Sequence, residues 1–439
     1  MITNIPQKPK QNTKLLNVLP NDDVLSQCIH CGMCLSTCPT YEMTKLETSS
    51  PRGRIKLIKS FARGEMLLTE AIADEMYFCL DCQACETACP AGVKYGSMVE
   101  AARAEVDSAG LYGSVFGRFI KRISLKYIIA YRFNLKAAAK LLYFYQVSGL
   151  QKFLHSIGFF KLVSERLGEI DSMSPKVSST FSSSVIKEVT FPEGEEKNRT
   201  AFLTGCLMDV MFADINKDTI EVLAASGSKV FTPKNQVCCG SLHAHNGDFE
   251  TAKKLAKKNI DIFNNLDYDY LVSNSAGCGA FMKEYGQLLA DDSTYSEKAK
   301  MFSAKVKDLT EFLVETKAQL PLKEINNSAA YHDACHLVHA QKITIQPRAV
   351  LQLIPGLKLK TLNESSWCCG SAGIYNVMRY DDSMVILKRK MENIGEANVE
   401  VVITGNPGCI SQIQYGAKKF NVNVEVVHPA TLLKKSIQS

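Results

Sequence analysis

The sixteen cysteines of this 439-residue chain are the residues most able to carry chemistry, and they form two groups of eight. The first group consists of two runs of the form C-x2-C-x2-C-x3-C-P. These runs contain Cys28, Cys31, Cys34 and Cys38 before Pro39, and Cys79, Cys82, Cys85 and Cys89 before Pro90. Each run supplies the four thiolates that a cubane iron-sulfur cluster requires, on a short loop that can direct backbone N–H groups at the sulfurs.

In paired runs of this kind, the fourth cysteine ligates the cluster that the other run mainly holds. We therefore expect one [4Fe-4S] cluster on Cys28, Cys31, Cys34 and Cys89, and a second on Cys79, Cys82, Cys85 and Cys38. Structural zinc is the alternative, but two C-x2-C pairs would suffice for it and the remaining cysteines and prolines would have no role. The pattern favours iron and sulfide.

The second group of eight cysteines lies in a region that repeats itself. Each half has one cysteine, then Cys-Cys-Gly (CCG), then another cysteine, and matched cysteines are 129 to 131 residues apart. The two sets are Cys206, Cys238, Cys239 and Cys278, and Cys335, Cys368, Cys369 and Cys409. This spacing indicates a tandem duplication. The eight thiols form a candidate further site for an iron-sulfur group; the alternative is that they are buried small residues, as free cysteines often are.

The elements around these motifs can also be predicted. Short β-branched runs alternate with helical stretches in both halves of the repeat, which favours a parallel sheet with the cysteines at the carboxyl ends of strands. Between the first two runs, Ser50 can cap a helix that begins at Pro51 and has Ile55, Ile58 and Phe61 at helical spacing. We expect an α/β chain overall, in which an α-helical ferredoxin domain precedes two tandem α/β CCG domains.

We predict four segments: the ferredoxin domain at 19–108, a basic helical segment and Ser-rich linker at 109–200, and CCG domains at 201–320 and 326–435. Within 111–170, ten Lys or Arg face two Glu and are interleaved with aromatic residues. This segment either packs as helices on its own domain or offers a surface for anionic lipid or an acidic partner. The Ser- and Pro-containing stretch 171–200 is typical of an exposed linker.

Composition and missing motifs exclude several classes of function. Hydrophobic residues make up 46% and charged residues 22% of the chain, as in ordinary soluble proteins. The first twenty residues lack the apolar core of an export signal, so we expect a cytoplasmic chain, with peripheral contact at the inner face of the cell membrane as an option. No dinucleotide or phosphate-binding glycine motif is present, which predicts no flavin of its own, and no motif supports nucleic-acid binding. We assign no catalytic residue.

Several stretches together carry a resemblance to a known family. CIHCGMCLSTCPTY, SPRGRIKLIK, CLDCQACETACPAGVKYG, the paired CCGS motifs and SAGCGAFMKEYGQ resemble the iron-sulfur subunit of bacterial glycolate oxidase. The resemblance implies an electron-transfer subunit that is inactive alone. FAD-linked oxidase subunits would oxidise glycolate to glyoxylate, and the chain would pass their electrons to an acceptor, with quinone the one expected.

More distant resemblances leave alternatives open. One is an iron-sulfur subunit of a D-lactate or glycerol-3-phosphate dehydrogenase. Another is a disulfide reductase that acts at the CCG sites, like heterodisulfide reductase, although Ser275 and Asn406 stand where its fuller motif has further cysteines. A third, which rests on no resemblance, is that the CCG halves only dock the flavoprotein. Candidate proton carriers or ligands are the histidines near the CCG cysteines, namely His243, His245, His332, His336 and His339, and Arg52 and Arg54 are candidate cations near a cluster.

Overall fold

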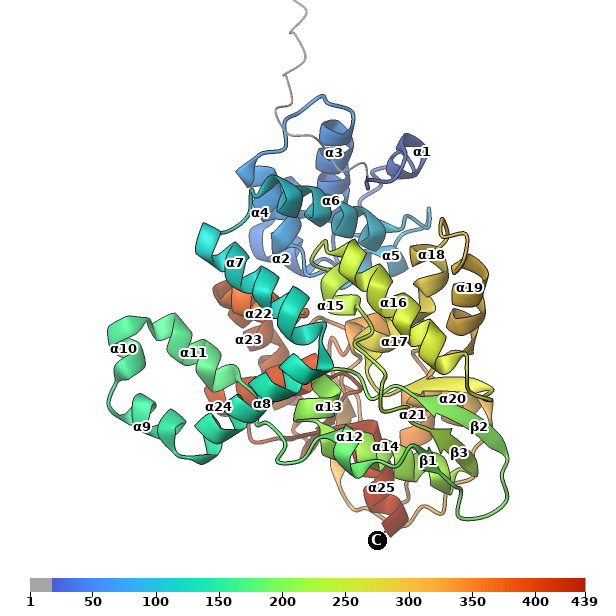
Figure 1. Ribbon diagram of the computed structural model, residues 1–439. Helices are drawn as coiled ribbons and strands as arrows, with labels where there is room; N and C mark the ends of the chain where they lie inside the picture. The colour runs from blue at the N-terminus through green and yellow to red at the C-terminus, as the bar shows by residue number, and fades with distance from the viewer. Residues whose placement is uncertain (1–17, 439) are drawn as a thin grey trace, which may run out of the picture. The chain divides into compact units, whose positions relative to one another are not determined.

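The computed structural model describes residues 18–438 as two compact units (Figure 1). Of the described residues, the first unit contains 18–123 with Leu242–Phe249, and the second contains Ser124–Ser241 with 250–438. Most of the stretch in which we predict no export signal lies outside the described residues. Within 18–438, no helix has the length and apolar character needed to cross a membrane.

The first unit is built from helices, with no strand among its described residues. Its elements are α1 (Asp22–Leu25), α2 (Pro39–Thr44), η1 (Glu47–Ser49), α3 (Pro51–Ala62), α4 (Glu70–Phe78), α5 (Ala84–Thr87), α6 (Tyr95–Ala109) and α7 (Val115–Ile123), and α15 (Ser241–Ala244) extends into it. As predicted, α3 begins at Pro51, and the Ser50 side chain accepts a hydrogen bond from the Gly53 N–H. Ile58 and Phe61 of this helix are fully buried. The prediction of an α-helical ferredoxin domain is confirmed.

The first half of the repeat forms a five-stranded sheet in the order β1-β3-β2-β4-β5. Its strands are β1 (Val189–Thr190), β2 (Asn198–Phe202), β3 (Ser228–Phe231), β4 (Tyr270–Ser273) and β5 (Val306–Asp308). Only the β1–β3 pair is antiparallel. The helices are α13 (Leu207–Met211), α14 (Ala213–Ala225), α16 (Phe249–Phe263), α17 (Ala276–Lys283), α18 (Tyr285–Leu288), α19 (Ser296–Lys305) and α20 (Leu309–Glu315).

The second half forms a parallel sheet in the order β7-β6-β8-β9, which repeats the order β3-β2-β4-β5 of the first. Its strands are β6 (Ser328–Tyr331), β7 (Lys358–Lys360), β8 (Val401–Ile403) and β9 (Glu425–Val427). Its helices are η3 (His336–Ala340), α21 (Gln346–Leu351), α22 (Tyr375–Met378), α23 (Tyr380–Ala397), α24 (Pro407–Lys419) and α25 (Pro429–Gln438). The α/β prediction, with two tandem domains, is therefore confirmed.

The two halves share one hydrophobic core. Phe202 and Phe312 from the first half and Tyr331 and Ile403 from the second belong to the same cluster of buried side chains. Hydrogen bonds join the loops at the carboxyl ends of the strands: the Ala276 N–H donates to the Gly405 carbonyl over 3.0 Å. The cysteine motifs follow these strand ends, so the shared core holds both sets of thiols in one unit.

The segment before the first sheet is helical but only partly exposed. It contains η2 (Ser124–Ile129), α8 (Arg132–Val147), α9 (Leu150–Ser156), α10 (Phe159–Val163), α11 (Glu165–Met173) and α12 (Ser182–Val185). The prediction of an exposed linker at 171–200 is wrong for part of that stretch, because Met173, Val177, Phe181 and Ile186 are buried and β1 joins the sheet. Widely spaced apolar residues give no periodic signal in a Ser-rich sequence, which is why composition alone misjudged them.

Candidate iron-sulfur and CCG cysteine sites

The first unit contains two cavities lined by the cysteines of the two ferredoxin runs. One is lined by Cys28, Cys31, Cys34 and Cys89, with Cys85 also on its wall. The loop that carries the first three thiols turns through His30 and Gly32, both of which have positive φ. A Cβ atom at Gly32 would lie 2.7 Å from an Arg52 guanidinium nitrogen, so glycine allows the loop to pass close to that side chain.

The second cavity is lined by Cys38, Cys79, Cys82 and Cys85. Cys79 follows the end of α4, and the chain then turns through Asp81 and Gln83, which again have positive φ. The Asp81 N–H donates to Cys79 Sγ over 3.3 Å, the type of bond that stabilises a thiolate bound to iron. Each cavity thus combines three cysteines of one run with the fourth cysteine of the other, and Cys85 lines both cavities.

The thiols that line these cavities are better explained as ligands of a metal cluster than as free thiols. Burial, followed by the neighbouring Cys82 and Cys79, raises the pKa of Cys85 well above its usual value. A cysteine in such a place is protonated unless a bound cation compensates several thiolates at once. Eight cysteines around two cavities, with N–H donors to sulfur, match the needs of two [4Fe-4S] clusters.

Two arginines of α3 lie beside these cavities, as predicted. Arg54 lines the second cavity and is fully buried, and its guanidinium donates to the Glu75 carbonyl over 2.8 Å and to Thr40 Oγ1 over 2.9 Å. Thr40 Oγ1 in turn lies 3.3 Å from Cys38 Sγ. Arg52 lines the first cavity, forms an ion pair with Glu47 and donates to the His30 carbonyl over 3.0 Å. Both cations are therefore fixed beside the cysteine loops.

A buried acidic pair in the first unit was not anticipated. His245 Nδ1 lies 3.2 Å from Asp81 Oδ2 and also contacts Glu100 Oε1. Although burial opposes the charge, Glu100 and Asp81 raise the pKa of His245 well above its usual value. Arg103 donates to the His245 carbonyl over 2.8 Å and to the Met76 carbonyl over 3.0 Å. These contacts fix Leu242–Phe249 within the first unit. One sign of this buried group is present in the sequence, an aspartate between Cys79 and Cys82.

The structure brings the four thiols of the first CCG half together. Cys206 Sγ and Cys238 Sγ are 3.3 Å apart. Contacts with Cys238, then with Cys278, and then burial raise the pKa of Cys239 well above its usual value. Cys206 follows β2, the CCG motif follows β3, and Cys278 lies on α17 after β4. Gly240 has φ +97°, and its N–H donates to Cys238 Sγ over 3.5 Å, so the CCG turn relies on glycine as expected.

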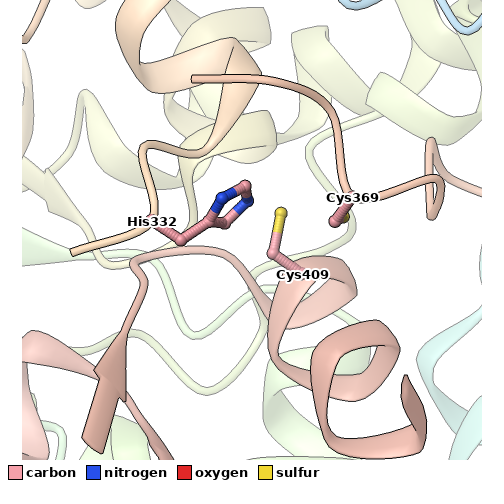
Figure 2. A group of neighbouring side chains, drawn as sticks. All are labelled: His332, Cys369 and Cys409. Atoms are coloured by element: carbon pink, nitrogen blue, oxygen red, sulfur yellow. The ribbon is translucent and has the colours of Figure 1, made fainter. Parts of the chain in front are cut away.

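In the second CCG half, a histidine joins the thiols. Potential ligand atoms of His332, Cys369 and Cys409 all lie within 4.8 Å of one another, and Figure 2 shows the imidazole ring turned towards the Cys409 sulfur. All three residues are buried. Cys369 also contacts the adjacent Cys368. Cys335 directly precedes η3, the helix that carries His336 and His339.

Comparison with known proteins agrees with this arrangement. A family model described as a 4Fe-4S dicluster domain matches residues 24–93, and one described as a cysteine-rich domain matches 200–283 and 329–414. A model of the linker region of the glycolate oxidase iron-sulfur subunit matches 116–174. The probable glycolate oxidase iron-sulfur subunit of Bacillus subtilis is 37% identical over 414 residues, which are 93% of each chain.

The chain belongs to the glycolate oxidase iron-sulfur subunit family. The Escherichia coli glycolate oxidase iron-sulfur subunit is 29% identical over 93% of this chain and 94% of its own length. Lactate utilization protein A of Shouchella clausii is 33% identical over 54% of this chain and 98% of its own. As a member of this family, the chain is an iron-sulfur electron-transfer subunit of an oxidoreductase.

Proposed function

We propose that this chain carries electrons through two [4Fe-4S] clusters in a complex that oxidises glycolate to glyoxylate. The observation that supports it most directly is the pair of cavities in the first unit, each with three cysteines of one run and the fourth of the other. We assign Cys28, Cys31, Cys34 and Cys89 to one cluster and Cys79, Cys82, Cys85 and Cys38 to the second. When bound, such clusters accept and release single electrons.

The protein's own residues set the conditions for that transfer. The thiolates hold the clusters in place, and the Asp81 N–H stabilises negative charge on Cys79 Sγ. Arg54 and Arg52 place positive charge beside the second and first cavity, which favours an added electron. Apolar side chains such as Ile55 and Val93 on the first cavity wall limit access of water. A drier site strengthens these electrostatic effects.

The partners follow from what the chain lacks and from its relatives. Its sequence contains no motif for a flavin or a nicotinamide, so the hydride from a 2-hydroxy acid must be accepted elsewhere. We infer that FAD-linked oxidase subunits accept it and deliver electrons to this chain, which passes them to an acceptor such as quinone. A D-lactate complex is supported less, because the similarity to lactate utilization protein A covers only 54% of this chain.

A further iron-sulfur site in the first CCG half is a second candidate. The close approach of Cys206 and Cys238, and the contacts of Cys239 with Cys278, favour a ligand role over isolated buried thiols. If instead these thiols reduce a disulfide, alanine at Cys238 should abolish turnover of a disulfide substrate while leaving the iron content unchanged. Loss of iron in the same variant would support the cluster.

Metal analysis and reconstitution test the main proposal. Protein purified without oxygen should contain about eight irons and eight sulfides for the two ferredoxin clusters. It should not oxidise glycolate until a flavoprotein partner is added. The proposal would be contradicted if the purified protein contained zinc and showed no visible absorbance. It would also be contradicted if the single chain oxidised glycolate.

The crossed ligation has its own test. Cys89→Ser should disturb the electron paramagnetic resonance signal of the cluster on the first run, and Cys38→Ser that of the cluster on the second. Cys34→Ser and Cys85→Ser serve as matched controls, because each should disturb the cluster of its own run. If Cys89→Ser and Cys85→Ser change the same signal, the crossed assignment is wrong.

A further inference from the structure

The mixed group of His332, Cys369 and Cys409 lies apart from the two ferredoxin runs and forms a compact set of ligand atoms. The three residues come from different places in the fold: the loop after β6, the CCG turn after β7, and α24 after β8. They are 1%, 2% and 3% exposed, respectively. Only the fold brings these distant positions together, so no local turn explains their approach.

The imidazole of His332 is placed as a metal ligand would be. Its ring is buried and turned towards the Cys409 sulfur (Figure 2). Neither ring nitrogen makes a well-formed hydrogen bond with the described chain, although the Ser365 carbonyl is near the ring. A buried imidazole without such partners is costly, and a bound metal would satisfy it.

The spacing of the three donor atoms is compatible with one bound metal ion. Zinc–sulfur bonds of about 2.3 Å and zinc–nitrogen bonds of about 2.0 Å give ligand atoms roughly 3.5–4 Å apart in a tetrahedron. The three atoms here lie within 4.8 Å of one another. The three donor atoms are thus close enough to share one ion.

The two halves of the repeat differ at the position of His332. His332 stands three residues before Cys335, and the residue three before Cys206 is Leu203, which is also buried. The first half therefore has four thiols and no imidazole at this place. If the position served packing alone, leucine would serve in both halves. The second half therefore offers both nitrogen and sulfur donors, which zinc prefers.

We propose that His332, Cys369 and Cys409 bind one divalent ion of the zinc class, separate from the iron-sulfur clusters, with water or the adjacent Cys368 as the fourth ligand. Two thiolates and a neutral imidazole balance the charge of such an ion in a buried place. The ion would hold together two loops and a helix of the second half.

The test is the metal content of the whole chain, purified without oxygen from zinc-containing medium. We expect one zinc per chain in addition to about eight irons, and its loss in His332→Leu, which copies the residue of the first half. His339→Leu is the matched control, since it removes another buried histidine outside the group and should keep the zinc. The iron content and visible absorbance should be unchanged in both variants.

A second measurement covers the case in which His332→Leu does not fold. With Co²⁺ in place of zinc, wild type should show thiolate-to-cobalt charge transfer and the intense visible bands of a tetrahedral site, and His332→Cys should keep the metal with shifted bands. Absence of zinc in wild type, or retention of zinc in His332→Leu, would overturn the proposal. Extra iron beyond eight that disappears in Cys409→Ser would also overturn it and assign an iron-sulfur group instead.

Discussion

At the scale of single residues, Arg54 and Arg52 differ in a way that can be measured. The Arg54 side chain is 0% exposed and pairs with Glu75 at 3.1 Å, whereas Arg52 retains 26% exposure in its pair with Glu47. A buried cation acts on its surroundings through a low dielectric, while water screens an exposed one. Arg54 should therefore contribute both to stability and to the reduction potential of the second cluster.

Arg54→Gln should lower the stability of the chain by about 3 kcal/mol, since removal of one partner leaves the other side of a buried pair uncompensated. It should also make the reduction potential of the second cluster more negative, because an added electron loses a nearby positive charge. Redox titration followed by electron paramagnetic resonance measures the potential, and thermal unfolding the stability. Arg52→Gln is the control and should act on the first cluster alone; unchanged potentials in Arg54→Gln would contradict the role given to this side chain.

His428 gives the second half of the repeat a defined pH dependence. Its Nε2–H donates to the Asn274 carbonyl over 2.8 Å and its Nδ1 accepts from the Ala430 N–H over 3.0 Å, so the ring is held neutral. Burial lowers the pKa of His428 to about 4. Because the unfolded chain binds the proton more readily, stability is lost as pH falls from about 6.5 towards 4.

Between pH 7 and pH 5, the unfolding free energy should fall by roughly 2 kcal/mol through this histidine alone. His428→Gln should be less stable at pH 7, because it loses fitted hydrogen bonds, but should show a smaller drop at pH 5. Urea unfolding at the two pH values, monitored by far-ultraviolet circular dichroism without oxygen, measures the difference. An equal pH dependence in both proteins would show that His428 does not titrate in this way.

Sequence pattern and fold contributed different parts of the sites. Cys28 to Cys38 and Cys79 to Cys89 are recognisable because a cluster loop is local, so its ligand spacing is written in consecutive residues. The group of His332, Cys369 and Cys409 has no such spacing, since strands that are neighbours in the sheet are far apart in sequence. His332 could be named as a candidate but not placed, and Asp81 and Glu100 became visible only with their contacts to His245.

At the scale of elements, the turn that follows each pair of adjacent cysteines depends on glycine. Gly370 has φ +88°, and a Cβ atom there would lie 2.7 Å from the Ser383 carbonyl oxygen on α23. The Ser383 hydroxyl also donates to the Gly370 carbonyl over 2.8 Å. The close approach of backbone to backbone fixes where Cys368 and Cys369 point. The sequence alone predicted the need for glycine. The contact with α23 explains why the backbone of the turn cannot shift to make room for a larger side chain.

Gly370→Ala should lower stability by at least about 2 kcal/mol, through left-handed backbone strain and the contact with the Ser383 carbonyl. Gly395→Ala is the matched control: it lies in the same helix that Ser383 belongs to, has open space around it, and should gain about 0.5–1 kcal/mol. Thermal unfolding compares the two. A Gly370→Ala variant as stable as Gly395→Ala would show that the turn is not constrained as described.

At the scale of the whole molecule, helices α9 and α10 form a surface that the rest of their own unit does not cover. No residue of either helix is buried, and Phe153 and Leu162 are 56% and 88% exposed. Within 132–167, six Lys or Arg face a single acidic residue, Glu165. Exposed aromatic and aliphatic side chains among basic residues are typical of a helix that lies on an anionic membrane. Lys121, by contrast, is 13% exposed and bonded to Tyr77 and Asp107, so it is not available to lipid.

We predict that α9 and α10 bind anionic lipid through their lysines. Lys152→Gln with Lys161→Gln should weaken co-sedimentation with phosphatidylglycerol vesicles roughly ten- to thirty-fold, because each basic residue near the surface adds about 1 kcal/mol. The attraction should fade as salt rises. Lys254→Gln with Lys258→Gln, which removes the same charge from exposed positions on α16, is the control and should bind like wild type. An equal loss of vesicle binding in both double variants would show that only net charge matters. No vesicle binding by wild type would indicate that these helices contact a protein partner instead.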